Sequence, residues 1–224
     1  MPEHKPYMLD GKRVPSVTTI TGCMDFGKSN GLMRWASRLG LQGIDAVGYR
    51  DETAEIGTLA HSIVEWHLTG QTPDFTDVPQ ERQNAALDSA RSFFAWLDEH
   101  EVETIESETA LVSREYRYGG RIDLYAKIDG LLTLLDVKTG KGIHWEAAVQ
   151  VAGGYKRLLE ENGRTVERVV ILNIPRSDDE SFLALPVPDC APFDAAFLVA
   201  RKMYGEGATA RKTFDRLMKG ALDE

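Results

Sequence analysis

Two apolar segments separated by a short turn constrain the fold more than any other feature of this sequence. Residues 120–126 and 131–140 have the composition of β-strands, and Asp129-Gly130 between them favours a tight hairpin turn. The run Leu131–Leu135 is almost entirely apolar, which is typical of a strand covered on both faces. The sequence therefore predicts a hairpin inside a sheet that has packed layers on both sides.

Three of the charged residues in this hairpin form a candidate site. Asp123 falls on the first strand and Asp136 near the end of the second, so pairing of the strands can bring their carboxylates together. Asp136 and Lys138 are two residues apart, and the period of a strand places both side chains on one face. One Asp-x-Lys alone is more often a pair of solvated charges on the outside of a hairpin. Here the apolar strand and the second acid favour a functional site.

An acid and a lysine that point the same way suit the hydrolysis of phosphodiester bonds. Carboxylates hold Mg²⁺, a hard ion that prefers oxygen ligands. A bound ion lowers the pKa of a water ligand and shields the negative phosphate. The lysine can orient or deprotonate the attacking water, or stabilise the charge that develops.

The remaining periodicities predict helices before the hairpin and both helices and strands after it. A short hairpin is expected over residues 7–20, turning at Asp10-Gly11. Further expected elements are helices at 32–41, 54–68, 79–99 and 145–162, strands at 104–113, 166–174 and 182–187, and C-terminal helices from Pro192, interrupted near Gly205 and Gly207. This order predicts an α/β fold with a central mixed β-sheet flanked by helices and with N-terminal helical additions.

Length and composition fit one domain over residues 1–224. Hydrophobic residues make up 42% of the chain, enough for a substantial core. We expect residues 1–100 to form the N-terminal hairpin and helices, 101–190 the catalytic sheet core and 191–224 the C-terminal helices. The formal charge of −9 argues against a uniformly basic DNA-binding domain. It leaves room for one basic groove on an acidic body.

Other classes of protein are excluded by what the sequence lacks. No apolar run approaches the roughly 18 residues of a membrane helix, and the first residues have no apolar signal core behind them. We therefore expect a cytoplasmic protein with no membrane partner. Cys23 and Cys190 are too few for a disulfide framework, an all-cysteine zinc site or an iron–sulfur cluster.

Four motifs together resemble the PD-(D/E)XK nuclease superfamily, in particular its RecB-like branch, which includes many phage-type exonucleases. That branch has a Gly-x-Ile-Asp strand, a strand ending in Asp-x-Lys-Thr-Gly, a helix with Gln and Tyr, and an upstream helix with Gly-x-x-x-His. The matching residues are Gly120–Asp123, Asp136–Gly140, Gln150 and Gly57–His61, and the stretch Asp10–Ile20 also resembles the start of phage-type members. The resemblance covers about residues 7–175 and implies a restriction-endonuclease-like core in a bacterial or phage-encoded nuclease.

The resemblance implies a metal site and a catalytic lysine. The metal ligands would be His61, Asp123 and Asp136, with the carbonyl group of Val137 as a fourth ligand. Lys138 would be the catalytic lysine. The cofactor would be one or two Mg²⁺ or Mn²⁺ ions.

Three further residues have roles in the resemblance. Glu108 matches a position that is often acidic in the superfamily and would bind a second ion or a metal-bound water. Glu65 stands one turn after His61 on the predicted helix. It would also bind a second ion or a metal-bound water, or it would orient His61. Gln150 would contact DNA or steady the active site.

The tyrosine that accompanies this glutamine departs from the family pattern. The branch has Gln-x-x-x-Tyr, whereas Tyr155 follows Gln150 by five positions, with Gly153-Gly154 between them. One extra residue rotates a side chain by about 100° around an α-helix. The role of Tyr155 therefore depends on whether the paired glycines distort the helix.

A nuclease also needs contacts to its substrate and, in this branch, partners in DNA metabolism. We expect contacts to DNA from Lys28, Arg34, Arg121, Lys141 and Tyr155. By resemblance, the activity is exonucleolytic degradation from DNA ends in recombination or repair, with a single-strand annealing or single-strand-binding protein as partner.

Two other functions compete with the nuclease. Residues 22–29 match the P-loop pattern Gly-x4-Gly-Lys-Ser of nucleotide hydrolases. A P-loop, however, follows a buried strand and runs directly into a helix, whereas a polar segment with Pro15 precedes this one and Asn30-Gly31 follows it. The other alternative is a non-catalytic DNA-binding module on a nuclease fold. Such a module would lack a catalytic residue, whereas Asp123, Asp136 and Lys138 are all present here.

Overall fold

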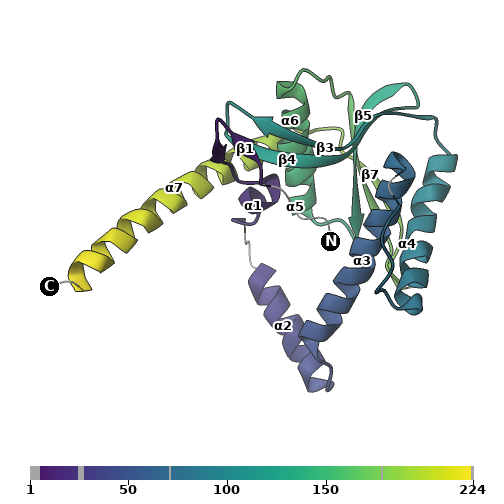
Figure 1. Cartoon of the computed structure of the whole chain (residues 1–224), viewed down its shortest axis with the longest axis horizontal. Helices are drawn as coiled ribbons and strands as arrows, with labels where there is room; N and C mark the ends of the chain where they lie inside the picture. The colour runs from purple at the N-terminus through teal and green to yellow at the C-terminus, as the bar shows by residue number, and fades with distance from the viewer. Residues whose placement is uncertain (1–5, 25–27, 71, 178, 223–224) are drawn as a thin grey trace.

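Five strands form one central sheet, in the order β3-β4-β5-β6-β7 (Figure 1). The computed structural model describes residues 6–24, 28–70, 72–177 and 179–222. The strands are β3 (Val102–Ser113), β4 (Tyr118–Ile128), β5 (Leu131–Thr139), β6 (Arg168–Ile174) and β7 (Leu183–Pro186). β5 and β6 are parallel, and every other neighbouring pair in this sheet is antiparallel. The predicted mixed sheet is confirmed.

The β4–β5 hairpin has the predicted turn. Ile128 pairs with Leu131 across it. Asp129 and Gly130 have φ angles of 51° and 83°, the left-handed conformations that a two-residue type I′ turn needs at both positions. β5 lies between β4 and β6, so the apolar run Leu131–Leu135 occupies the centre of the sheet.

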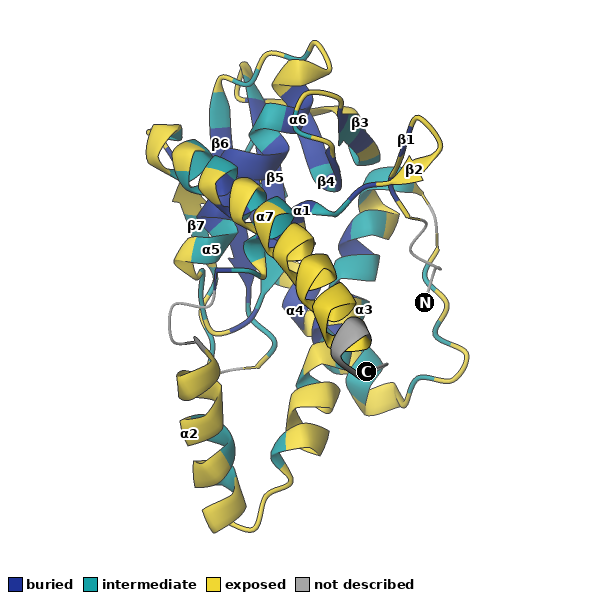
Figure 2. Ribbon diagram, turned by 90° about the vertical axis from the view of Figure 1, so that its left-hand side faces the viewer, coloured by how far each residue is buried: buried dark blue, intermediate teal, exposed yellow. Residues whose placement is uncertain are grey.

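Helices cover both faces of the sheet (Figures 1 and 2). One face packs against α3 (Ala46–Thr69) and α4 (Gln80–Asp98), with Ile63 and Phe93 in its apolar cluster. The other face has its own apolar cluster around Val149 and Phe197. It is covered by α1, by α7 and by one continuous helical segment that consists of α5, η1 and α6. The bounds of these elements are α1 (Val17–Thr21), α5 (Trp145–Ala148), the π-helix η1 (Val149–Tyr155), α6 (Lys156–Glu161) and α7 (Ala191–Leu222). The α/β class with helices on both faces is as predicted.

The N-terminal hairpin is shorter than the sequence predicts. It consists of β1 (Met8–Leu9) and β2 (Lys12–Arg13) only. Ser16 then caps α1, because its Oγ accepts a hydrogen bond of 2.9 Å from the Thr19 amide. The segment after Pro15 is therefore helical and not part of the hairpin.

Two helical parts project from the body of the protein. α2 (Lys28–Leu41) and the start of α3 form one projection, and the end of α7 forms the other; Figure 2 shows both largely exposed. The expected interruption near Gly205 and Gly207 is wrong, because α7 is one continuous helix. A glycine costs about 1 kcal/mol relative to alanine inside a helix, and the strong helix formers around these two offset that cost. No helix in the described ranges is both long and apolar enough to cross a membrane.

Candidate active site

Two buried acids and a lysine lie together on β4 and β5. The Asp136 side chain is 1% exposed, and its Oδ2 lies 2.6 Å from the Nζ of Lys138. Asp123 Oδ2 accepts a hydrogen bond of 2.8 Å from the amide of Val137, which ties the first acid to the strand that carries the second. The hairpin thus brings together the three charged groups identified from the sequence.

Burial and mutual charge set the protonation of these groups. Burial raises the pKa of Asp136 to about 6, although the Lys138 ammonium opposes the shift. Burial also acts to raise the pKa of Asp123, but the nearby His61 outweighs it and the pKa is lowered. For Lys138, burial lowers the pKa, but the Asp136 and Asp123 carboxylates together raise it above the ordinary value, so the ammonium remains charged.

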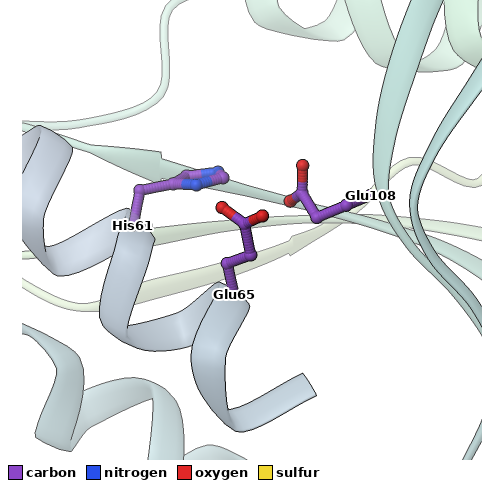
Figure 3. A group of neighbouring side chains, drawn as sticks. All are labelled: His61, Glu65 and Glu108. Atoms are coloured by element: carbon purple, nitrogen blue, oxygen red, sulfur yellow. The ribbon is translucent and has the colours of Figure 1, made fainter. Parts of the chain in front are cut away.

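A second group of side chains faces these residues from a helix and from the edge strand. His61 and Glu65 lie one turn apart on α3, and Glu108 comes from β3; Figure 3 shows the three converging. Each offers one ligand atom, and these atoms all lie within 4.8 Å of one another. His61 Nε2 is also 3.2 Å from Asp123 Oδ2, so His61 belongs to both groups.

The charges of this second group are perturbed as well. Burial lowers the pKa of His61, but the carboxylates around it, Asp123 above all, together raise it to about 9. Burial and the negative charge of Asp123 raise the pKa of Glu108 to about 7. Such a crowd of negative groups around one histidine is an environment that a divalent cation would relieve.

Glu108 has an unusual backbone. Its φ of 50° lies in the left-handed region, inside a strand and close to the register shift between Thr104 and Glu106. Such a conformation costs a residue other than glycine on the order of 1–3 kcal/mol and is concentrated at functional sites. The strain supports a role for the Glu108 side chain in the cluster.

The π-helix brings Gln150 and Tyr155 together in spite of the extra residue. Gln150 Nε2 donates a hydrogen bond of 2.7 Å to the Tyr155 hydroxyl oxygen. In a π-helix the backbone bonds join residues five apart, so positions 150 and 155 lie one above the other. The rotation expected for an α-helix is therefore absent. Burial raises the pKa of Tyr155 well above its ordinary value, so the hydroxyl keeps its proton.

Two glycines of the sequence motifs make room for neighbouring side chains. A β-carbon at Gly57 would lie 2.5 Å from Thr139 Oγ1, and one at Gly120 would lie 2.7 Å from Tyr155 Cε1. Both positions therefore require glycine for close approach. Gly153 and Gly154 likewise admit the packing of α7 and α1 against the π-helix.

A cavity of about 470 Å³ opens beside Lys138 and Gln150. Its other walls come from α1, from α2 and from the segment that leads into α5, and include the hydroxyl groups of Thr18, Thr21 and Ser29. Lys138 and Gln150 therefore border a space that a substrate group can enter.

The residues expected to bind DNA are spread over several elements. Arg34 is exposed on α2, the helix that contributes Leu32 to the cavity wall. Arg121 Nη1 lies 3.6 Å from Glu108 Oε2, and Lys141, which is largely exposed, lies two residues after β5. The side chain of Lys28 is outside the described part of the chain.

Two residues near the site were missed in the sequence. Tyr7 of the N-terminal segment packs against Gly119, where a β-carbon would lie 2.4 Å from its Cγ. Burial raises the pKa of Tyr7, with Arg121 and Glu108 nearby. Arg176, after β6, lies beside Gly57 and Gly140. Neither follows from a local pattern, because both approach the site only through the tertiary fold.

The described part of the P-loop motif does not have the context of a nucleotide-binding loop. Residues 25–27 lie outside the described ranges. The segment before Gly22 is the helix α1 rather than a buried strand, and Gly22 forms the C-cap of that helix. The expectation that Asn30-Gly31 would prevent a helix after the motif is wrong, because α2 begins at Lys28 and contains both residues. The buried strand that a P-loop requires before its glycines is replaced by a helix, and without that strand the motif is not in the setting of a nucleotide-binding loop.

The donor set fits a hard divalent cation. Asp136 Oδ1 is buried and has no hydrogen-bond partner among the described residues. A buried carboxylate oxygen is costly when it is left unpaired, and an ion would satisfy it. Carboxylates with one imidazole are ligands that Mg²⁺ and Mn²⁺ accept.

Comparison with known proteins gives similarity in structure only. No protein-family model and no curated protein sequence matches this chain. A Eubacterium rectale protein provisionally named as an exonuclease is 14% identical, with a TM-score of 0.49, over 66% of this chain and 64% of that one. LHK-Exo in complex with dAMP is 11% identical, with a TM-score of 0.45, over 93% of this chain and 94% of that one.

Another similar structure is the alkaline exonuclease LHK-Exo from Laribacter hongkongensis. It is 13% identical, with a TM-score of 0.32, over 72% of this chain and 90% of that one. At such identities, and with TM-scores below 0.5, these similarities carry no argument about activity, which rests on the side chains described above.

Proposed function

We propose that this protein is a metal-dependent deoxyribonuclease of the PD-(D/E)XK type that degrades DNA from its ends. The observation that carries the proposal is the contact between Lys138 and the buried Asp136, with Asp123 beside them and His61 facing them. A charged lysine next to paired carboxylates provides both an ion site and a donor for a phosphate oxygen.

The proposed ligands of the ion come from the sheet and from α3. Asp123, Asp136 and His61 would hold it, with the Val137 carbonyl as a further ligand. Glu65 and Glu108, together with His61, offer a second set of donor atoms. When bound, Mg²⁺ or Mn²⁺ supplies activation of the attacking water and shielding of the phosphate charge.

Lys138 acts as a hydrogen-bond donor in this mechanism. Its ammonium keeps its proton beside Asp136, so it is not a base in this state. It orients the scissile phosphate and stabilises the negative charge that develops on the phosphate oxygens. Gln150, which borders the same cavity and is held by Tyr155, steadies the substrate next to it.

The substrate side of the proposal is DNA. Lys28, Arg34, Arg121 and Lys141 would contact phosphates without reading sequence. The exonuclease activity would serve recombination or repair inside the cell, with a single-strand annealing or single-strand-binding protein as partner.

Cleavage of labelled DNA tests the proposal. Linear end-labelled DNA and covalently closed circular DNA are incubated with Mg²⁺ or Mn²⁺, with EDTA as control, and the wild type is compared with Lys138→Ala. We expect the wild type to degrade linear DNA only, and the variant to lose at least about 100-fold in rate, the scale of a lost transition-state donor. Arg91→Ala, on the exposed surface of α4, is the matched control and should cleave like the wild type.

The possible results separate the competing functions. Absence of ion-dependent cleavage of both DNAs would overturn the nuclease proposal. Cleavage of the circle would retain the nuclease and reject the exonuclease. ATP turnover that is lost in Lys28→Ala and unaffected in Lys138→Ala would favour the nucleotide hydrolase.

A further inference from the structure

The helix that carries His61 and the strand that carries Asp136 and Lys138 approach each other closely just before His61, in addition to their packing in the apolar core. His61 lies on α3, whereas Asp136 and Lys138 lie on β5. Gly57, one turn before His61, approaches Thr139 so closely that a β-carbon would lie 2.5 Å from the Thr139 Oγ1. The position of His61 relative to the acids therefore depends on what fixes this contact.

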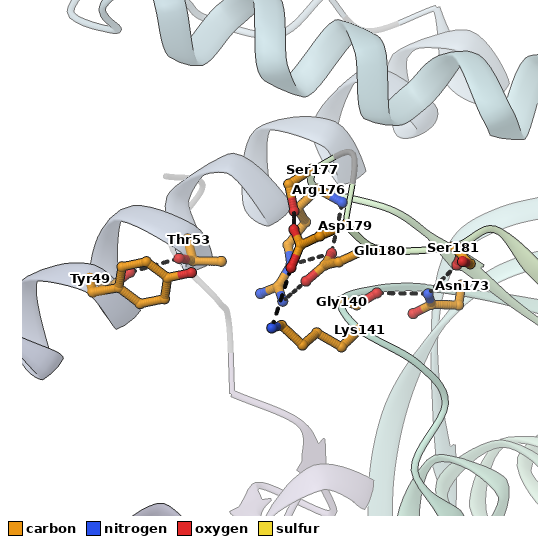
Figure 4. Close-up of polar contacts among 10 residues, drawn as sticks. All are labelled: Tyr49, Thr53, Gly140, Lys141, Asn173, Arg176, Ser177, Asp179, Glu180 and Ser181. Atoms are coloured by element: carbon orange, nitrogen blue, oxygen red, sulfur yellow. Dashed lines mark hydrogen bonds and ion pairs between the residues drawn. The ribbon is translucent and has the colours of Figure 1, made fainter. Parts of the chain in front are cut away.

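Arg176 packs on both sides of that contact. Its Cδ would lie 3.6 Å from a β-carbon at Gly57, and its Nη2 would lie 3.6 Å from one at Gly140. The aliphatic stem thus lies against α3, and the guanidinium lies over the residue that follows β5. Figure 4 shows Arg176 between α3 and the chain after β5.

Glu180 fixes the Arg176 side chain in this place. The Glu180 carboxylate accepts hydrogen bonds from Arg176 Nε at 3.1 Å, from Nη2 at 2.6 Å and from the backbone amide of Arg176 at 2.8 Å (Figure 4). The side chain of Glu180 is 2% exposed and that of Arg176 is 19% exposed. A buried pair of this kind gives little net stability compared with apolar residues, so its effect is chiefly on geometry.

Asn173 joins the residue after β5 to the segment that carries Glu180, from inside the sheet. It is fully buried on β6, directly beside Lys138 in the register of the parallel strands. Its Nδ2 donates to the carbonyl oxygens of Gly140 at 2.7 Å and Ser181 at 3.1 Å. The residue after β5 and the segment that carries Glu180 thereby form one unit.

We infer that Arg176 and Glu180 are positioning residues that set the distance of His61 from the acids on the sheet and thereby tune the affinity for the divalent ion. The inference rests on the proposed nuclease site. Removal of the pair frees α3 at Gly57, so His61 shifts while Asp123 and Asp136 stay with the sheet. Outer partners of metal ligands typically change ion affinity by about 10- to 100-fold.

Direct ion binding tests this inference without relying on cleavage. The double variant Arg176→Met/Glu180→Leu removes both charges and so avoids leaving one of them buried and unpaired. Mn²⁺ affinity is measured by calorimetry without DNA, and DNA affinity by fluorescence anisotropy at saturating Ca²⁺. We expect Mn²⁺ affinity to fall by about 10-fold or more, with DNA affinity unchanged and cleavage recovered at high Mn²⁺.

Two further variants keep the result decisive. Arg176→Lys retains the charge without the two-pronged geometry and should show a smaller loss of Mn²⁺ affinity, which carries the test if the double variant does not fold. The double variant Arg157→Met/Asp194→Leu removes a similar pair between α6 and α7. In that pair Arg157 donates from Nε to Asp194 Oδ1 at 2.8 Å and from Nη2 to Asp194 Oδ2 at 2.5 Å. This variant should leave Mn²⁺ affinity unchanged.

The contradicting outcomes are distinct. Unchanged Mn²⁺ affinity in both Arg176 variants overturns the inference. The same holds if DNA affinity falls with a shallower salt dependence, because Arg176 would then be a direct phosphate contact. Absence of Mn²⁺ binding by the wild type would instead reject the proposed function.

Discussion

The sheet half and the helix half of the site differ in what holds them. Asp123 is fixed by the backbone of the neighbouring strand, through the bond from the Val137 amide, and Asp136 is almost completely buried. His61 is 32% exposed and is carried on a helix whose approach depends on side-chain packing at Gly57. The sheet half is therefore held by backbone hydrogen bonds, whereas the position of His61 depends on how the side chains of α3 pack on the sheet.

This difference separates two kinds of defect. Damage to the sheet half should abolish ion binding at any ion concentration, whereas damage to the helix half should weaken binding in a way that added ion overcomes. Each variant below is a test of that separation.

Asp136→Asn should have the largest effect. It removes a buried carboxylate oxygen that has no hydrogen-bond partner among the described residues and that an ion would use. We expect cleavage to fall by at least about 1,000-fold, more than the 10- to 100-fold typical of outer partners of a metal site. Cleavage rates at rising Mn²⁺ measure this, and recovery at high Mn²⁺ would break the distinction between the two halves.

A change of pH should have the next largest effect on ion binding. The pKa of His61 is about 9, because the surrounding carboxylates, Asp123 above all, together outweigh burial, and an ion must displace this proton to use the imidazole. Below pH 9 the proton competes, so Mn²⁺ affinity should rise by about tenfold per pH unit from pH 7 to 9. Calorimetry at three pH values checks this, and a flat profile would show that His61 is not a ligand.

His61→Gln should lower Mn²⁺ affinity by about 10- to 100-fold and remove most of that pH dependence. Cleavage should return at high Mn²⁺, since the acids of the sheet remain in place. His100→Gln is the control, because His100 lies at the far end of α4 and stacks on Trp96. A loss that saturating Mn²⁺ does not repair would mean that the two halves are not separable.

Gly57→Ala should weaken the protein and its ion site together. The added methyl group would meet Thr139 Oγ1 at 2.5 Å, and overpacking of this kind costs about 1–3 kcal/mol. Urea denaturation and Mn²⁺ titration measure the two effects. Thr139→Ala in the same chain removes the clashing oxygen and should restore part of both; if it restores neither, the contact does not set the helix position.

Tyr155→Phe should have the smallest effect. It removes only the hydroxyl group that accepts the bond from Gln150, a loss of about 0.5–1.5 kcal/mol in unfolding free energy. Mn²⁺ affinity should not change, because neither residue belongs to the ion cluster. A change in ion affinity would show that the π-helix also helps to hold the ion ligands of the sheet half.

The same contrast explains how much the sequence could predict. The β4–β5 hairpin follows from a local apolar pattern and the Asp129-Gly130 turn, so Asp123, Asp136 and Lys138 could be placed before the structure was known. The continuity of α7 through Gly205 and Gly207 could not be predicted, because glycine is only a weak indicator of helix ends when strong helix formers surround it.

Tertiary packing set the remaining features. Glu108 could be proposed as an acid near the site, but its left-handed backbone depends on strand pairing that no short window of sequence contains. Arg176 has no motif of its own and reaches Gly57 only through the order of the strands. The contacts that hold the two halves together are thus the least visible in the sequence.

The widened turn at Val149–Tyr155 has a consequence for how related sequences are sought. A helix that gains one residue normally turns every later side chain away from its partner, and a search with rigid spacing would discard such a chain. Here the insertion is confined to a single turn, and the Gln150–Tyr155 bond remains intact. Profiles that accept either four or five steps between glutamine and tyrosine would therefore retrieve chains with this helix that fixed patterns overlook.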